Sequence, residues 1–476
     1  MSHQHSKIAR RAFLQRMGQL GIAGTAAPWA INLAAISDAA AFTNDGYKAL
    51  VCIFLYGGND HGNTVVPVDP ESYNAYATAR GTALISAGGI VIPRGELAGT
   101  ALSTAGLPSG REYALAPTLS RLKPLFESNK LAVQMNVGPL IVPTTVQQFK
   151  DRSVPLPPKL FSHNDQQSVW QSSAAEGAVR GWGGALGDLA LRGNGGNSLF
   201  TCMSVTGNAV FLSGNSALSY KIGTGGAVAI APVVGTAYGS AACQAALSKL
   251  ITEPRTHALE NELNRITARS ISSQASLAGA LGGSSAKFDS FLPDQTDGAN
   301  NPLNRQLKMV ARLIDAQQSL GLSRQVFMVS LGGFDHHDNL GTGHPRLLTQ
   351  LGHAMAGFQG AMDSIGKSDA VTAFTASEFG RTIVSNGDGS DHGWGAHHFV
   401  MGGAVNGKRF YGTAPTPANG GPEDVGQGRY LPTTAVDQFT ATLATWFGAQ
   451  AGTELRSVAP FIEYFNTRDL GFMRRT

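Results

Sequence analysis

Four short apolar runs recur along the chain, and each is followed by glycine or by a polar side chain. They cover residues 49–55, 131–137, 325–331 and 370–375. Runs of this length without alternating polar positions are typical of strands that are buried on both faces, as in a parallel sheet. The pattern therefore predicts four buried strands whose ends carry the polar groups.

Two stretches between these runs repeat apolar residues every three or four positions, which predicts helices. The repeating positions are Leu307, Val310 and Ile314 before the third run, and Leu351, Met355, Phe358, Met362 and Ile365 after it. Alternating strands and helices favour an α/β fold with a mostly parallel central sheet flanked by helices. Ligands of such sheets bind outside the carboxyl ends of the strands, where the polar groups would gather.

The first 41 residues are predicted to be a twin-arginine signal peptide. Arg10 and Arg11 precede a Phe-Leu pair, a weakly apolar stretch follows, and Ala39 to Ala41 offer a cleavage site. We therefore expect the twin-arginine translocase as a partner during export, and a periplasmic or extracellular location. The stretch is too broken by Pro28 for a stable membrane span. The alternative is a basic helix that stays attached.

Residues 42–476 are predicted to form a single domain with an insertion around 200–302. Residues 213–240 are rich in glycine, alanine and serine, and residues 282–302 are polar, so both are expected at the surface around a helical part at 253–281. Of the three cysteines, Cys52 lies in an apolar run and is expected in the core. Whether Cys202 and Cys243 pair is left open by the sequence.

Charge excludes one class of partner. The chain has a formal net charge of +4, and most of that excess lies in the predicted signal. The remaining chain is close to neutral, so nucleic acid is not expected as a partner.

Histidines and carboxylates concentrate in one segment. Seven of the twelve histidines lie between positions 336 and 398, interleaved with Asp335, Asp338, Glu378, Asp388 and Asp391. Such side chains are the usual ligands of zinc or manganese. A single Asp-His pair is more often a capping carboxylate beside a surface histidine. Clusters at successive strand ends favour a metal site, and Asp60 after the first strand would face the same edge.

Several motifs together resemble an exported family catalogued as domain of unknown function 1501. The resemblance runs from about residue 49 to residue 472. Its motifs are Phe54 to Pro67, Ser162 to Gln166, Gly181 to Gly184, Leu331 to Asn339, Ser377 to Thr382 and Asp391 to His398. That family in turn resembles the alkaline phosphatase/sulfatase superfamily, whose members hydrolyse phosphate or sulfate esters at a centre of one or two metal ions.

The resemblance implies one or two divalent ions (zinc, manganese or calcium) and a set of ligands. The implied ligands are Asp60, Asp335, His337, Asp391, His392 and His397. Asp335 and His337 stand closer together than the superfamily pattern has them. No certain nucleophile follows Asp60; the best placed hydroxyl is that of Ser162, beside His163, and Thr64 is the alternative.

A metal-dependent hydrolase would act on a small anionic ester or a carbohydrate-linked substrate, with Ser162, His163 and Arg381 as its catalytic residues. The planar guanidinium of Arg381 would hold the anionic group; its alternative roles are an ion pair with Glu378 or a surface charge. The competing hypothesis for the whole chain is a non-catalytic exported binding or assembly protein on the same fold. An iron oxidoreductase is less favoured, because such sites usually lie in β-barrels.

Overall fold

The computed structural model describes residue 42 and residues 45–227, 229–282 and 286–474. The predicted signal peptide, residues 1–41, therefore lies outside the described residues. None of the helices in the described part of the chain is long and apolar enough to cross a membrane.

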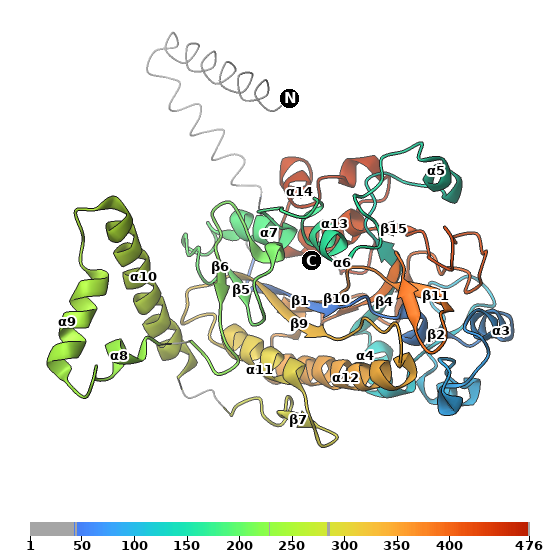
Figure 1. The fold of residues 1–476 in the computed structure, drawn as a ribbon, viewed down its shortest axis with the longest axis horizontal. Coiled ribbons are helices and arrows are strands. Elements are labelled where there is room, and N and C mark those ends of the chain that lie inside the picture. Colours follow the sequence, from blue (N-terminus) through green and yellow to red (C-terminus); the bar gives the residue numbers. More distant parts are fainter. Residues whose placement is uncertain (1–41, 43–44, 228, 283–285, 475–476) are drawn as a thin grey trace, which may run out of the picture.

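A nine-stranded sheet forms the centre of the molecule (Figure 1). Eight strands follow the order β14-β4-β13-β10-β1-β9-β5-β6, and β15 also pairs with β4. Only β13 runs antiparallel to its neighbours in this sheet. The predicted mostly parallel α/β sheet is thus confirmed. Its strands are β1 (Lys48–Tyr56), β4 (Leu131–Gly138), β5 (Cys202–Ser204), β6 (Ser219–Lys221), β9 (Arg324–Gly332), β10 (Val371–Ala376), β13 (Ala396–Met401), β14 (Arg409–Tyr411) and β15 (Thr434–Ala435).

The sheet separates two hydrophobic cores, and β1 supplies both. Ala49, Val51 and Ile53 pack into one core, whereas Leu50 and Cys52 pack into the other. Successive side chains of a strand point to opposite faces, so an uninterrupted apolar run is needed where both faces are buried. This is the physical reason why the apolar runs marked strands.

Helices cover both faces of the sheet (Figure 1). On one face lie α4 (Lys123–Glu127), α11 (Pro302–Asp315) and α12 (Leu340–Ser364); on the other lie α6 (His163–Ser172), α7 (Trp182–Ala190), α13 (Val436–Phe447) and α14 (Thr453–Val458). The apolar stripes predicted around Leu307 and Leu351 are the buried faces of α11 and α12.

Smaller elements surround this frame. Helices α3 (Pro70–Ala79) and α5 (Val146–Asp151) lie outside it, with the strand pairs β2 (Val65–Pro67) with β3 (Tyr113–Leu115), β7 (Gln295–Thr296) with β8 (Ala299–Asn300), and β11 (Arg381–Ser385) with β12 (Ser390–His392). Short 3-10 helices are η1 (His61–Asn63), η2 (Ile85–Ala87), η3 (Arg94–Thr100), η4 (Pro117–Leu122), η5 (Val210–Leu212), η6 (Ser368–Ala370) and η7 (Ile462–Tyr464). The hairpin β11–β12 carries part of the site.

An arm of three helices projects from the body (Figure 1): α8 (Ala231–Val234), α9 (Ala241–Thr252) and α10 (Ala258–Leu281). Strands β5 and β6 lie within the predicted insertion, residues 200–302, but belong to the main sheet: β5 pairs with β9, and β6 pairs with β5. No disulfide joins Cys202 and Cys243: the first is buried in β5, the second is exposed on α9, and both are free.

Candidate metal centre

The register of three parallel strands brings distant residues to one edge of the sheet. Tyr56 at the end of β1 pairs with Gly332 at the end of β9, and Phe54 pairs with Ala376 at the end of β10. The loops that follow these three strands therefore leave the sheet side by side. Ligand sites of open α/β sheets form at such an edge.

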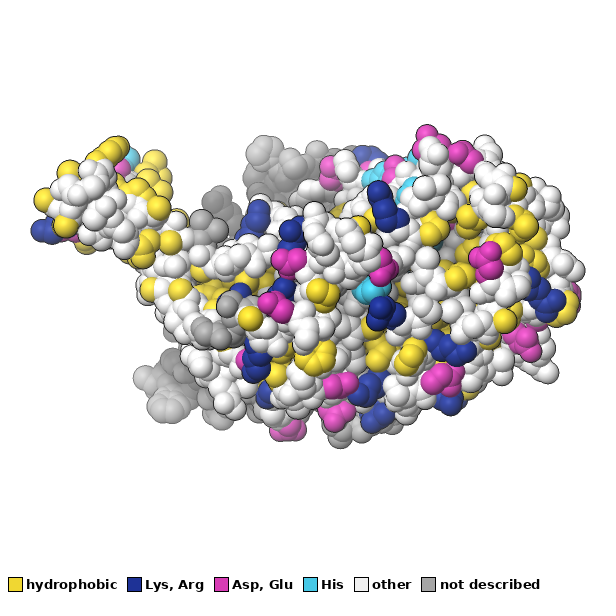
Figure 2. Space-filling view, turned by 90° about the horizontal axis from the view of Figure 1, so that it is seen from below, with side chains coloured by type: hydrophobic (Ala, Val, Ile, Leu, Met, Phe, Trp, Pro, Cys, Tyr) yellow, Lys and Arg dark blue, Asp and Glu magenta, His cyan; other side chains and the backbone are white. Residues whose placement is uncertain are grey.

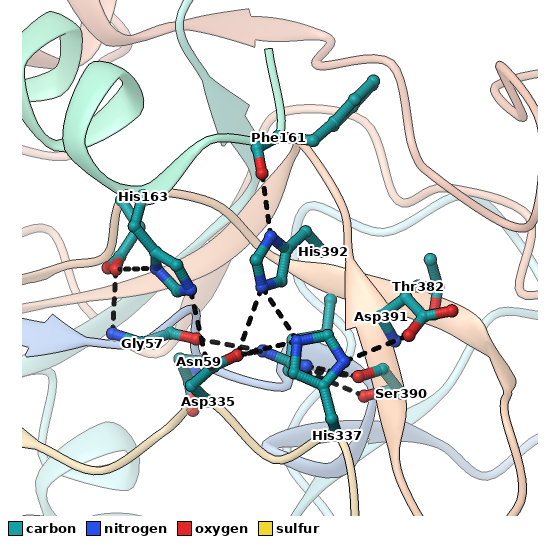
Figure 3. Close-up of polar contacts among 12 residues, drawn as sticks. Gly57, Asn59, Phe161, His163, Asp335, His337, Thr382, Ser390, Asp391 and His392 are labelled. Carbon is teal, nitrogen blue, oxygen red and sulfur yellow. Dashed lines mark hydrogen bonds and ion pairs between the residues drawn. The ribbon is translucent and has the colours of Figure 1, made fainter. Parts of the chain in front are cut away.

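Three side chains converge there, and we call them the three-residue group: His163, Asp335 and His392 (Figure 3). His163 Nε2 lies 3.3 Å from Asp335 Oδ2. His392 Nε2 lies 3.2 Å from Asp335 Oδ1. One ligand atom from each residue lies within 4.8 Å of the other two. Among the described residues this is the one such group of histidine, cysteine and carboxylate ligands.

Hydrogen bonds on the far side of each imidazole define which nitrogen faces the group. His163 Nδ1 lies 2.9 Å from Glu378 Oε1, and His392 Nδ1 lies 2.8 Å from the carbonyl oxygen of Phe161. Both partners are acceptors, so each Nδ1 carries a proton and each Nε2 presents a lone pair in the neutral ring. Two lone pairs and a carboxylate pointing at one another form a donor set that fits a cation.

Glu378 is fully buried and orients His163. Its Oε1 also accepts hydrogen bonds from the backbone nitrogen of Gly57 at 2.8 Å and from Gln167 at 3.0 Å. The hydrogen bond to Glu378 raises the pKa of His163, whereas burial lowers the pKa of His392. A carboxylate behind a histidine fixes its ring and makes it a stronger ligand.

His337 and Asp391 form a pair beside the group. His337 Nε2 lies 3.0 Å from His392 Nε2, and His337 Nδ1 lies 3.1 Å from Asp391 Oδ1. Burial opposes ionisation of Asp391, but hydrogen bonds from Asn386 and His337 lower its pKa. The side chains of His337 and Asp335 are 47% and 42% exposed, so solvent reaches the group directly. Figure 2 shows histidine side chains at the surface of the body, next to charged residues.

Arg381 is buried beneath the group instead of facing a substrate. Its Nη1 donates to Asp335 Oδ1 at 2.8 Å and to the carbonyl oxygen of Gly57 at 3.0 Å, while Nε donates to Ser390. Burial alone would raise the pKa of Asp335, but the hydrogen bond and charge of Arg381 lower it. Arg381 is therefore neither a surface charge nor the partner of Glu378, and its guanidinium orients Asp335 in place of holding an anion.

Gly57 permits the close approach of two of these loops. Its φ is +115°, and a Cβ atom on it would lie 2.4 Å from the backbone nitrogen of Asp335. A side chain here would push the loop after β9 away from the loop after β1. The glycine is therefore part of the geometry of the group.

Three of the residues expected at the site lie elsewhere. Both carboxylate oxygens of Asp60 accept from Arg80, at 2.6 and 2.8 Å, and the pair is fully buried. The ring of His397 is buried, where its Nδ1 accepts from the backbone nitrogen of Asn136 at 3.1 Å. Arg80 thus engages both oxygens of Asp60, and neither Asp60 nor His397 belongs to the three-residue group.

Ser162, expected as the nucleophile, also stands apart from the group. Its hydroxyl donates to Asp165 Oδ2 at 2.9 Å at the start of α6. The next residue, His163, was expected to be catalytic beside Ser162 and instead supplies a nitrogen to the group.

Arg429 is a site residue that the sequence did not reveal. Its Nε donates to the carbonyl oxygen of His392 at 2.8 Å, and its guanidinium lies 4.7 Å from the centre of the Phe161 ring. It lies in an irregular Gly-rich loop, residues 426–429, which carries no motif. The glycines of that loop are the only local feature of the sequence that could have pointed to Arg429.

The fold and this edge of the sheet define an α/β protein with a histidine–carboxylate site at the carboxyl ends of its strands. The chain matches the family described as Protein of unknown function (DUF1501) over residues 47–459, and it belongs to that family. No curated protein matches the chain.

Two solved structures show a distant likeness. One is Ps i-CgsB in complex with k-i-k-neocarrahexaose, and the other is Ps i-CgsB alone. Each has 9% sequence identity and a TM-score of 0.34, covering 89% of this chain and 78% of the other.

We expect Glu378→Gln to weaken metal binding by about 10- to 100-fold, the usual effect of losing the carboxylate behind a histidine ligand. Titration with zinc, followed by calorimetry, measures this. Glu454→Gln is the matched control, since Glu454 is also a buried carboxylate that accepts from a backbone nitrogen. Equal affinity of the Glu378 variant and the wild type would contradict the role of Glu378.

Proposed function

We propose that the chain is an exported, metal-dependent hydrolase of phosphate or sulfate esters, acting in the periplasm or outside the cell. The observation that carries the proposal is the convergence of the Nε2 atoms of His163 and His392 on the carboxylate of Asp335. The location rests on the twin-arginine pattern at the N-terminus.

His163, Asp335 and His392 would hold the ion. Two imidazoles and one carboxylate suit zinc or manganese better than calcium, which prefers a shell of oxygen ligands. A divalent ion at this position would polarise the ester oxygen and lower the pKa of a bound water. Arg381 keeps Asp335 ionised and in place for this purpose.

His337 would move the proton. Its Nε2 faces the group, and Asp391 lies behind its Nδ1 at 3.1 Å. A carboxylate in this position orients an imidazole and stabilises its protonated form. His337 would accept a proton from the attacking water and return it to the leaving oxygen. Water is the proposed nucleophile because the hydroxyl of Ser162 donates a hydrogen bond to Asp165.

Arg429, rather than Arg381, would hold the anionic part of the ester. We expect Arg429→Gln to raise KM for an anionic ester about tenfold or more, since a hydrogen bond to a charged group contributes about 1.5–3 kcal/mol. Metal content should not change. Arg346→Gln, an exposed arginine on α12, is the control. An unchanged KM would remove Arg429 from the substrate site.

The function is tested by supplying the purified chain with zinc, manganese or calcium and measuring release of phosphate and sulfate from simple aryl and sugar monoesters. Metal-dependent turnover that is lost on chelation supports the proposal. A chain that binds metal but turns over none of these esters would instead favour the non-catalytic binding or assembly role.

A further inference from the structure

The projecting arm, residues 231–281, buries very little apolar surface. Helix α9 has the sequence AACQAALSKLIT, yet none of its twelve residues is buried. Helix α10 has 24 residues, of which only Asn264, Ser273, Leu277 and Leu281 are buried. Leu277 and Leu281 anchor the arm, because they pack into the core that contains α11 and α12. Beyond this anchor the two helices have almost no core of their own.

Several large apolar side chains in and just before the first part of the arm are exposed instead. Large hydrophobic residues that are exposed number twelve in the described part of the chain, and seven of them lie between positions 230 and 266. These seven are Ile230, Val234, Tyr238, Leu250, Leu259, Leu263 and Ile266. Figure 2 shows apolar side chains over the surface of the arm. A concentration of this kind marks an interaction surface, whereas single exposed residues do not.

On α10 the exposed residues form a stripe that faces away from α9. Leu259, Leu263 and Ile266 are spaced four and three positions apart, which places them on one side of the helix. Asn264 lies on the side towards α9, where its side chain donates to the carbonyl oxygens of Leu250 and Glu253 at 2.9 and 2.6 Å. The stripe is therefore free to pack against another helix.

The charges of α10 indicate which helix would pack on the stripe. Glu260 and Glu262 lie in the first part of α10, and Arg265 and Arg269 follow. Arg265 also pairs with Glu262 within the helix, at 2.8 and 2.9 Å. A second α10 in antiparallel orientation places the acidic part of each helix opposite the basic part of the other. A membrane surface is disfavoured, because helices that bind it carry an excess of Lys and Arg. The arm instead has four basic residues against three acidic ones.

We propose that the arm is a dimerisation element, in which α10 packs in antiparallel orientation against α10 of a second copy of this chain. The contact is isologous, as in most homodimers, since the same stripe serves both copies. The arm stands clear of the body (Figure 1), so two arms can meet without a clash of the bodies. The stripe spans only about two helical turns, so the dimer is expected to dissociate on dilution.

Sedimentation velocity of the full-length chain, over roughly 1 to 100 μM, tests the proposal. We expect a concentration-dependent dimer for the wild type. Leu259→Glu/Leu263→Glu should be monomeric throughout, with an unchanged circular dichroism spectrum. Val179→Glu is the control, because Val179 is 86% exposed but lies outside the arm.

Charge exchange tests the identity of the partner. Glu260→Arg/Glu262→Arg should be monomeric alone, and so should Arg265→Glu/Arg269→Glu, but an equimolar mixture of the two should form a heterodimer. A wild-type chain that remains monomeric at every concentration would overturn the proposal. Co-sedimentation of that monomer with vesicles of anionic phospholipid would assign the stripe to a membrane surface instead. A dimer that survives both leucine substitutions would also overturn it.

Discussion

Replacing Asp335 with alanine is expected to reduce the bound metal of the purified chain from about one equivalent to below about a tenth. Asp335 is the only carboxylate of the three-residue group, and each of its oxygens faces one imidazole, Oδ2 towards His163 and Oδ1 towards His392. Without it, two neutral rings remain, too few ligands for a divalent ion. Elemental mass spectrometry of the protein measures the metal.

Asp338→Ala is the matched control, because Asp338 is an exposed carboxylate in the same loop after β9. It should retain the metal of the wild type. Arg381 loses its acidic partner in the Asp335 variant, so a thermal melt must show that the fold persists. Full metal content in a folded Asp335→Ala variant would remove the three-residue group as the binding site.

Replacing Asp60 with asparagine is expected to destabilise the fold by about 3–5 kcal/mol, the effect of leaving one partner of a buried ion pair alone. Both side chains of the Asp60–Arg80 pair are fully buried, and Arg80 donates to both oxygens of Asp60. Urea denaturation measures the loss. The double variant Asp60→Leu/Arg80→Met should recover most of it, since no unpaired charge then remains buried.

The pH dependence of the same pair distinguishes a charge effect from a packing effect. Burial alone would raise the pKa of Asp60, but Arg80 lowers it from 3.8 to about 2. A lowered folded-state pKa stabilises the fold above the unfolded-state value, and this contribution is lost as the pH falls through the folded-state value. The stability difference between wild type and Asp60→Asn should therefore shrink between about pH 4 and pH 2. A difference that is constant over this range would show that charge is not its cause.

The strands could be predicted because burial on both faces demands an uninterrupted apolar run, and β1 meets that demand over residues 49–55. The edge of the sheet that carries the site could also be predicted, because ligands of parallel sheets bind at the carboxyl ends of the strands. The role of Asp60 could not be predicted, because a carboxylate after a strand is equally compatible with ligation and with an ion pair. Only the fold shows that Arg80, at the end of α3, reaches it.

The orientation of the histidine rings could not be predicted from the sequence either. His397 stands in a motif rich in ligand residues, but its ring turns towards His61, 4.8 Å away between ring centres. His163 stands outside the densest cluster, yet Glu378 turns its Nε2 to the group. Ring direction depends on partners more than 200 residues distant in sequence, and no local pattern encodes it.

The hydrogen bonds to these distant partners mean that the three-residue group also contributes to the stability of the fold. The hydrogen bond between His392 and Phe161 joins residues 231 positions apart in the sequence. The hydrogen bond between His163 and Glu378 joins residues 215 positions apart. An ion shared by His163, Asp335 and His392 would close the same long loops, whose ends an unfolded chain rarely brings together. The free energy of binding that ion is thus also free energy of folding. On the proposed export route, an ion bound before translocation would hold the start of α6 to β12 and to the loop after β9 while the chain crosses the membrane.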